Sequence, residues 1–383
     1  MLDAPTLLVF LGGLGAGEAE RLVAGARLVA TLDSVEQALA TGAFAGAVLV
    51  TDDLSVGRSL HSADVAPLLA PGSSPHLELS LDVPGEAFHF GRRLANVIEE
   101  RNLRSVVYMG GGSLPLATPE DFRAITDALA GGGAVTNNLY SSDLVAFPVV
   151  PQVLPVVEGV SRDNALARAL FEAGVPVEAL PRTLATQMDI DSPADLLVLA
   201  LTGFGGPRLR EYLAALALDT SRLQPVLPLF TDTRAQILVA GRVGSHAWQY
   251  LERETACRVR LFAEERGMEA EGRAESGEAR SVLGFLLEAV GLERFFVALA
   301  EMGDAAFLDT RVLLAHRRIA ASREDRFLSD LGRWGDITDP FLRDFTRAAL
   351  AAPLPVLLGG HSLMSGGLMA LNEHAWREKE RGG

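Results

Sequence analysis

The chain contains one lysine and one cysteine among its 383 residues. The lysine, Lys379, stands in the last few residues, whereas Schiff-base, pyridoxal-phosphate and P-loop sites each need a lysine inside the fold. The single cysteine, Cys257, excludes an intrachain disulfide and any site built from several cysteines. We therefore expect no haem, iron-sulfur cluster, pyridoxal phosphate or structural zinc.

Positive charge is also scarce. Lysine and arginine together number 34 against 49 aspartates and glutamates, so the formal net charge is -15. A surface this acidic repels the phosphate backbone of nucleic acids and the headgroups of anionic lipids. We expect neither a nucleic acid nor a membrane as a partner.

Long uninterrupted apolar helices are absent from the sequence pattern. The longest uncharged run, Ala348 to Asn372, contains Pro353, Pro355 and four glycines, which break a spanning helix. The apolar stretch near the N-terminus is interrupted by Gly12 and Gly13 and lacks the positive charge of a secretory signal. With 49% hydrophobic residues, the composition predicts a folded, soluble protein, which we expect in the cytoplasm.

Short β-rich runs alternate with helical patterns through most of the chain, which is typical of an α/β fold. The length suggests two domains. The alternation breaks near 203–207 and resumes after a proline-containing connector at 224–232. From this alternation we predict a parallel sheet with crossover helices in a first domain over 1–204, a helix and linker over 205–235, and a second, smaller α/β domain over 236–383.

Individual elements follow from local patterns. The segment 118–131 is the clearest helix, because Thr118 can cap it, Pro119 occupies its first position and Gly131 ends it. The other expected helices cover 161–174, 192–201, 208–218, 246–254, 279–290, 340–350 and 366–376. The expected strands cover 6–11, 47–50, 105–109, 175–180, 236–240, 258–262, 305–308 and 355–358.

Three motifs in the first half occur in a recognisable order. The first strand leads into Gly12-Gly13-Leu14-Gly15-Ala16-Gly17, a turn whose N–H groups can approach a phosphate. Gly110-Gly111-Gly112-Ser113-Leu114-Pro115-Leu116 follows a later strand, and Asp189-Ile190-Asp191-Ser192-Pro193-Ala194-Asp195-Leu196 comes last. Over about residues 1–204 this order resembles the GT-A nucleotidyltransferase superfamily, and most closely its guanylyl- and cytidylyltransferase-like branches. These branches include the molybdenum-cofactor and 2-phospholactate guanylyltransferases.

The resemblance implies a Rossmann-like mixed-sheet fold for residues 1–204. It also implies an enzyme that transfers a nucleotidyl group from a nucleoside triphosphate to a phosphorylated small molecule, with Mg²⁺ as the metal. It places the nucleotide against Gly12, Gly13, Gly15, Gly17 and Ser113. Two further candidates, Asp52 and Asp53, follow the strand at 47–50 at the carboxyl end of the sheet. They could hold a ribose or a metal, or else cap the helix that follows.

Several charges that the resemblance requires are missing. Gly17 and Leu22 stand where the family has an arginine and a lysine, and Ser113 stands where it has a metal-binding aspartate. A neutral hydroxyl is a poor ligand for Mg²⁺. Four arginines could supply the missing charge, although their positions favour exposed helix faces instead: Arg21, Arg27, Arg92 and Arg93.

Two pairs of polar residues complete the candidates of the first half. Asp189 and Asp191 are the carboxylates best spaced to hold a metal and are candidates for catalysis, although Asp191 could simply precede a helix. Asn137 and Asn138 stand about where related enzymes bind the acceptor. Asparagine also favours turns for its own sake, so both interpretations stay open.

The second half contains two glycine turns after strands, Gly241–His246 and Gly359–Ser362. If these strands are parallel in one sheet, the turns lie side by side at its carboxyl edge and form an anion-binding crevice. A histidine such as His361 could act there as an acid or a base. Alternatively, the glycines only permit tight turns. The expected lining residues are Arg242, Ser245, His246, Arg311, His361 and Ser362.

Three functions are consistent with these patterns. The leading interpretation is a nucleotidyltransferase-like protein with degenerate metal and phosphate motifs, acting on a nucleotide and a phosphorylated metabolite. The first alternative is a non-catalytic protein of the same fold that binds a nucleotide or metabolite. The second is a small-molecule enzyme with its site in the C-terminal domain. The sequence leaves catalysis open, as it does a homo-oligomeric state.

Overall fold

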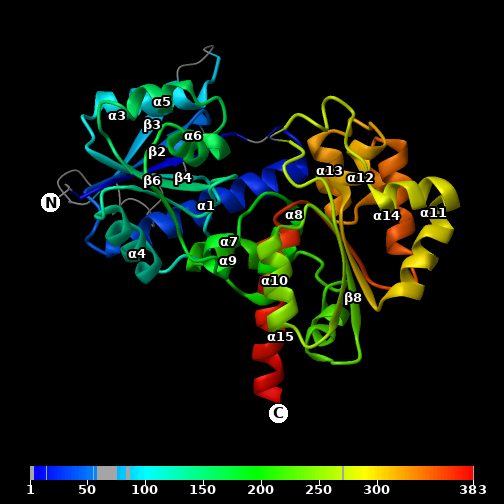
Figure 1. The fold of residues 1–383 in the computed structure, drawn as a ribbon. Helices are drawn as coiled ribbons and strands as arrows, with labels where there is room; N and C mark the ends of the chain where they lie inside the picture. The colour runs from blue at the N-terminus through cyan, green and yellow to red at the C-terminus, as the bar shows by residue number, and fades with distance from the viewer. Residues whose placement is uncertain are drawn as a thin grey trace. The chain divides into compact units, whose positions relative to one another are not determined.

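The computed structural model describes residues 4–13, 15–54, 56–57, 76–82, 87–269 and 271–382 (Figure 1). Their contacts divide the chain into two compact units. Among the described residues, the first unit draws on those within 4–13, 27–187 and 206–209, and the second unit draws on those within 15–26, 188–205 and 210–382. The segment that contains Asp189 and Asp191 therefore belongs to the second unit.

The first unit is built on a seven-stranded mixed sheet. The spatial order is β3-β2-β1-β4-β6-β5-β7, and β6 runs antiparallel to both of its neighbours. This arrangement confirms the predicted mixed α/β fold. The strands are β1 (Thr6–Phe10), β2 (Gly46–Thr51), β3 (Leu77–Leu81), β4 (Ser105–Gly110), β5 (Ala134–Thr136), β6 (Leu144–Pro148) and β7 (Val177–Ala179).

Helices cover both faces of this sheet (Figure 1). Alternate side chains of β1 point to opposite faces, so Leu7 and Leu8 belong to two separate apolar cores. The Leu7 core includes Val35 of α1 and Phe122 of α4, and the Leu8 core includes Phe90 of α3. The helices with residues in this unit are α1 (Glu18–Ala40), α3 (Phe90–Glu100), α4 (Pro119–Leu129), α5 (Leu154–Gly159), α6 (Leu166–Glu172) and α7 (Leu184–Gln187).

One predicted helix of the first unit begins later than its sequence pattern suggests. The expected helix over 161–174 is a 3-10 turn over Asp163–Ala165 followed by α6, which starts at Leu166. The carboxylate of Asp163 accepts a hydrogen bond from the Tyr108 hydroxyl at 3.0 Å. This long-range contact, which the local pattern does not reveal, holds the first turn in a different conformation.

The second unit contains a parallel sheet with the order β11-β10-β8-β9. Its strands are β8 (Gln236–Gly241), β9 (Arg258–Ala263), β10 (Ala305–Asp309) and β11 (Val356–Gly359), close to the four predicted ones. The elements around it are α8 (Pro193–Thr202), a 3-10 segment (Gln224–Thr231), α10 (Ser245–Glu254), α11 (Val282–Met302), α12 (Thr310–His316), α13 (Arg323–Asp330), α14 (Pro340–Leu350) and α15 (Leu368–Gly382). A further helix, α9 (Pro207–Leu216), starts in the first unit and continues in the second.

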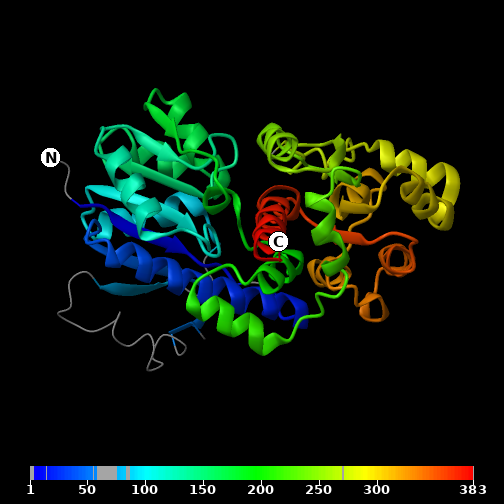
Figure 2. The ribbon, with the colours of Figure 1, turned by 90° about the horizontal axis from the view of Figure 1, so that it is seen from below.

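Apolar side chains pack α11 and α14 against one face of this sheet. Phe295 and Phe345 join Leu308 and Leu358 in one buried core. Elsewhere in this unit, α8 contacts β11 and α15 contacts the 3-10 segment. Figure 2 shows the ribbon from below, with the C-terminal helix α15 in red. Among the described residues, no helix has both the length and the apolar character of a membrane-spanning segment.

The helix predicted over 279–290 is longer in the structure. It begins at Val282, capped by the Ser281 hydroxyl, and continues to Met302. Gly291 interrupts it with φ 75°, a left-handed conformation that glycine adopts at little cost. The chain resumes the helix beyond this kink because Phe295 and Phe296 are buried in the core.

Candidate functional site

The first unit has a topological switch point between β1 and β4. The strand β1 lies between β2 and β4, and all three are parallel. Ligands of open α/β sheets bind outside the carboxyl ends of the strands at such a point. The residues predicted to bind nucleotide after these strands therefore reach one edge: Gly12, Gly13, Asp52, Asp53 and Ser113.

Two glycine-containing segments approach each other closely at this edge. The Gly111 N–H donates to the Phe10 carbonyl oxygen at 2.8 Å. A Cβ atom on Gly111 would lie 3.0 Å from the Cα of Leu11, which leaves no room for a side chain. Gly112 has φ 88° and therefore also requires glycine. These glycines let the loop after β4 fold directly onto the end of β1.

Arg27 of α1 lies against the same loop. Its Nε donates to the Gly111 carbonyl oxygen at 2.6 Å, and a Cβ atom on Gly112 would be 2.7 Å from its Cγ. The sequence interpretation favoured an exposed position, which is wrong for Arg27, because its side chain is half-buried at the sheet edge. Its two terminal nitrogens make no hydrogen bond with the described residues. A cation thus lies at the loop where the resemblance implies a metal-binding aspartate.

A buried tyrosine and a carboxylate lie beside this loop. Burial, followed by the charge of Asp163, raises the pKa of Tyr108 well above its usual value, so the hydroxyl stays protonated and donates to Asp163. The sequence analysis did not single out Asp163. Its pairing joins residues 55 positions apart, and no local pattern indicates such a contact.

Asn137 and Asn138 hold the chain between β5 and β6. The Asn137 amide donates to the Asp143 carboxylate at 3.1 Å, and its oxygen accepts the Leu144 N–H at 3.1 Å. The Asn138 side chain accepts the Tyr140 N–H at 3.2 Å, as in an ordinary turn. Both residues thus have structural roles, and binding of an acceptor by them stays a prediction.

Protein carboxylates occupy N–H groups along the predicted phosphate-binding turn. In the first unit, Asp52 accepts the Gly13 N–H at 2.7 Å. In the second unit, Glu20 accepts the Gly17 N–H at 3.0 Å, and Glu324 accepts the N–H of Ala19 at 2.9 Å. A Cβ atom on Gly15 or Gly17 would collide with Glu20 or Glu324 respectively, and Leu14 lies outside the described residues.

Asp189 and Asp191 lie just before α8 in the second unit. The Asp189 carbonyl accepts the Ser362 hydroxyl at 2.8 Å, and the Asp191 N–H donates to Asp195 at 3.0 Å. Within the part of the chain that the structure describes, no three histidine, cysteine, aspartate or glutamate side chains are arranged to hold a metal. These two carboxylates alone would leave most of an octahedral Mg²⁺ shell to other ligands.

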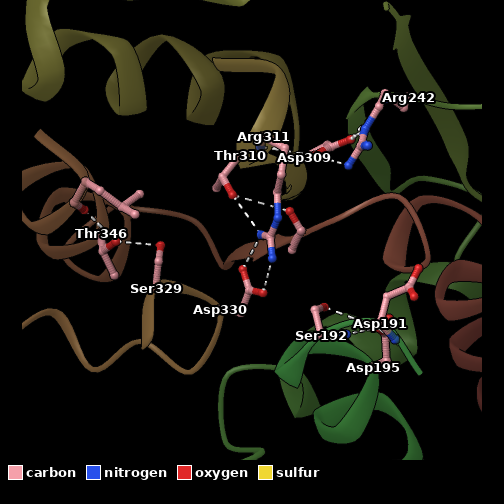
Figure 3. A network of polar contacts seen from close by, with 12 residues as sticks. Asp191, Ser192, Asp195, Arg242, Asp309, Thr310, Arg311, Ser329, Asp330 and Thr346 are labelled. Carbon is pink, nitrogen blue, oxygen red and sulfur yellow. Dashed lines mark hydrogen bonds and ion pairs between the residues drawn. The ribbon is translucent and has the colours of Figure 1, made fainter. Parts of the chain in front are cut away.

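Asp195 caps α8 from a buried position. Its Oδ2 accepts the Ser192 N–H at 2.8 Å and the Ser192 hydroxyl at 3.2 Å (Figure 3). Its Oδ1 has no partner among the described residues. Burial, followed by the nearby charge of Asp191, raises the pKa of Asp195 to about 7. The sequence pattern predicts the cap but not this change in acidity.

The loops of the second unit meet at the carboxyl edge of its sheet, as predicted. Arg242 follows β8 and donates through Nε to Asp309 at 2.6 Å, while Arg311 donates through both terminal nitrogens to Asp330 at 2.6 Å (Figure 3). Burial alone would raise the pKa of Asp309, but the charge and hydrogen bond of Arg242 and the charge of Arg311 together outweigh it, and the pKa is lowered. Asp309 is therefore ionised and fixes the orientation of Arg242.

His361 joins these arginines at the same edge. Its Nδ1 lies 2.9 Å from the Arg242 carbonyl oxygen, so Nδ1 carries the proton and donates. Burial, followed by the charge of Arg242, lowers the pKa of His361, which keeps the imidazole neutral near pH 7. The Nε2 lone pair is then available, and it makes no hydrogen bond with the described residues.

The other predicted crevice residues lie elsewhere along the edge. The Ser362 hydroxyl points to the Asp189 carbonyl, and Ser245 is exposed in the first turn of α10. His246, in the same turn, is half-buried. The sequence analysis missed Asp330, which comes from the end of α13 and not from a strand–turn motif.

Comparison with known proteins finds similar solved structures, but it does not assign the chain to a family. No family model matches the chain, and no curated protein matches it. A 4-diphosphocytidyl-2C-methyl-D-erythritol synthase from Anaerococcus prevotii is 13% identical, with 50% of this chain and 95% of that chain covered and a TM-score of 0.34. A cytidylyltransferase from Leptospira borgpetersenii is 12% identical, with 59% and 96% covered and a TM-score of 0.39.

A third solved structure contains a metal. This Mycobacterium tuberculosis protein, in a complex with manganese, is 19% identical, with 51% of this chain and 96% of that chain covered and a TM-score of 0.33. These matches cover about half of the chain. The narrower likeness to molybdenum-cofactor and 2-phospholactate guanylyltransferases stays a prediction.

Proposed function

We propose that this chain is a nucleotidyltransferase-like protein whose first unit binds a nucleotide at the β1–β4 switch point. The position of Arg27 carries the proposal, because its guanidinium lies at the loop Gly110–Ser113 and its two terminal nitrogens have no partner among the described residues. A guanidinium can donate two parallel hydrogen bonds to one phosphate group. In this proposal Arg27 supplies positive charge to the phosphates. A bound metal would otherwise supply this charge, but Ser113 is a poor metal ligand.

The same observations favour binding over catalysis. In-line nucleotidyl transfer needs strong neutralisation of the charge that develops on the phosphates. Asp52 and Glu20, in contrast, bring negative charge to the N–H groups of Gly13 and Gly17. A divalent cation would have to arrive with the nucleotide.

Calorimetric titration of the full chain with CTP and GTP tests the proposal. We expect binding that persists in excess EDTA and that weakens about tenfold or more in Arg27→Gln, since a charged hydrogen bond contributes roughly 1.5–3 kcal/mol. Arg92→Gln is the matched control, because Arg92 is exposed on α3, and its affinity should equal that of the wild type. Equal affinity in Arg27→Gln, or no binding of either nucleotide, would overturn the proposal.

A pyrophosphate-release assay separates the transferase interpretation from simple binding. Binding that disappears in EDTA, together with metal-dependent release of pyrophosphate in the presence of a phosphorylated acceptor, would favour nucleotidyl transfer. If binding persists without metal and no pyrophosphate is released, the chain is a nucleotide-binding protein of the nucleotidyltransferase-like fold.

A further inference from the structure

The carboxyl edge of the second sheet carries a set of positive groups that the proposed function does not use. Arg242, Arg311 and His361 follow the three adjacent strands β8, β10 and β11. Figure 3 shows the guanidinium of Arg242 directed to Asp309 and that of Arg311 directed to Asp330. The two aspartates hold both arginines in fixed orientations, as preorganised donors need.

Gly360 lies beside both guanidinium groups without a side chain between them. A Cβ atom on this residue would lie 3.5 Å from Nε of Arg311 and 3.9 Å from a terminal nitrogen of Arg242. Gly360 does not have a positive φ, so its backbone does not require glycine. Those distances are ordinary van der Waals contacts, so packing does not require glycine either. A larger side chain at position 360 would, however, cover the two guanidinium groups.

A third arginine, Arg326, interacts electrostatically with Arg311 of this edge and with the carboxylates of Glu269 and Asp330. Arg326 of α13 makes no ion pair with the described residues, and its Nε is buried without a hydrogen-bond partner among them. Burial, followed by the charge of Arg311, lowers the pKa of Arg326. A buried donor without a partner is rare in folded proteins and calls for a ligand or water.

The N-terminus of α10 adds neutral donors after Arg242. Its cap residue is Gly244, and no side chain caps the helix among the described residues. The first N–H groups of a helix favour an anion. In contrast, Asp309 caps the neighbouring α12 with its own carboxylate, which accepts the Arg311 N–H at 3.1 Å.

We propose that this edge of the second unit binds the phosphate group of a small phosphorylated molecule, beside Gly360 and between Arg242 and Arg311. Phosphate fits better than carboxylate because its oxygens can accept from several donors that converge from different directions. Neutral His361 carries its proton on Nδ1 and can accept a proton at Nε2 next to the bound group. The inference is independent of nucleotide binding in the first unit.

The test is a calorimetric titration of the full chain with inorganic phosphate, with acetate at equal ionic strength as the comparison. We expect phosphate to bind the wild type and acetate to bind at least tenfold more weakly. Gly360→Val should weaken phosphate binding at least tenfold by filling the space beside the arginines. Gly335→Val is the matched control, since a Cβ atom there meets nothing within 4 Å, and it should bind like the wild type.

Two further variants keep the test decisive. Arg326→Gln removes the cation without an ion pair, so it should fold and bind phosphate more weakly even if Gly360→Val does not fold. Arg27→Gln should leave phosphate binding unchanged, which separates this inference from the proposed nucleotide site. No phosphate binding by the wild type, equal binding of acetate, unchanged affinity in both Gly360→Val and Arg326→Gln, or loss of phosphate binding in Arg27→Gln would each overturn it.

Discussion

Glycine residues determine how closely the loops approach at both sheet edges. Gly241 ends β8 with φ 136°, and a Cβ atom there would fall 3.2 Å from Cγ of Asp309 and closer still to its Cβ. The absent side chain lets Arg242 and Asp309 pair across neighbouring strands. Gly111 has the same effect in the first unit, where it allows the loop after β4 to contact Leu11.

Asp195 gives a prediction at this scale. Its usual pKa is 3.8 and its pKa in the folded chain is about 7, so between about pH 4 and 7 folding is linked to proton uptake. The contribution of Asp195 to stability is therefore largest at low pH and falls as the pH rises through this window, by up to a few kcal/mol. Asp195→Asn keeps an acceptor for the cap and removes the titration.

Urea unfolding at pH 5 and pH 8 checks this prediction. The wild type should lose more stability between the two pH values than Asp195→Asn does, so the variant gains relative stability at pH 8. The exposed Asp127→Asn serves as the control, and its pH dependence should match the wild type. Parallel pH dependence of the wild type and Asp195→Asn would contradict the expectation.

Helix ends show how local sequence positions an element. The α4 helix begins with a capping box in which the Thr118 hydroxyl accepts the Asp121 N–H at 3.3 Å and the Asp121 carboxylate accepts the Thr118 N–H at 2.8 Å. The sequence pattern predicted this start. At α1 the capping carboxylate comes from Glu324, 305 residues away from Ala19, which no local pattern could reveal.

The α4 capping box leads to a prediction at the scale of an element. Thr118→Ala should lower the free energy of unfolding by about 1 kcal/mol, because one N–H of the first turn loses its partner. Thr126→Ala, in the same helix, should have little effect or stabilise, since alanine has the higher helix propensity. Chemical denaturation of both variants measures the difference, and equal destabilisation would show that the cap contributes nothing specific.

At the scale of the whole molecule, charge sets which partners can approach. The net charge of -15 belongs to a chain whose few arginine clusters lie at particular loops. Local guanidinium groups can attract a small phosphate at short range, where screening by salt is weak. A long polyanion, in contrast, meets the negative charge of the whole surface.

We therefore predict that the protein does not bind duplex DNA. Non-specific DNA-binding proteins have dissociation constants of about 10⁻⁴–10⁻⁶ M at physiological salt and bind more tightly at lower salt. The anisotropy of a labelled duplex should stay constant up to about 10 μM protein at about 50 mM salt. A salt-dependent rise in anisotropy would show that a local basic surface outweighs the net charge.

The sequence by itself determined many of the elements and the general fold class, but its patterns gave no prediction for β3, β5, β6, α1, α3 or α13. Caps, glycine stops and apolar periodicity are local, so they predicted α4, α8, β1 and most of the second sheet close to their observed bounds. The motif order also predicted which loops reach the sheet edges. The sequence could not show that β6 runs antiparallel, because pairing direction depends on partners distant along the chain.

Only the tertiary structure decided which side chains meet at the candidate sites. Arg27 reaches Gly111 across 84 residues, and its charge looks like that of any exposed helix until the sheet is assembled. Asp330 meets Arg311 from the end of a helix that carries no recognisable motif. Local patterns reflect backbone preferences over a few residues, whereas these contacts depend on how distant segments pack, and that is why the structure was needed to find them.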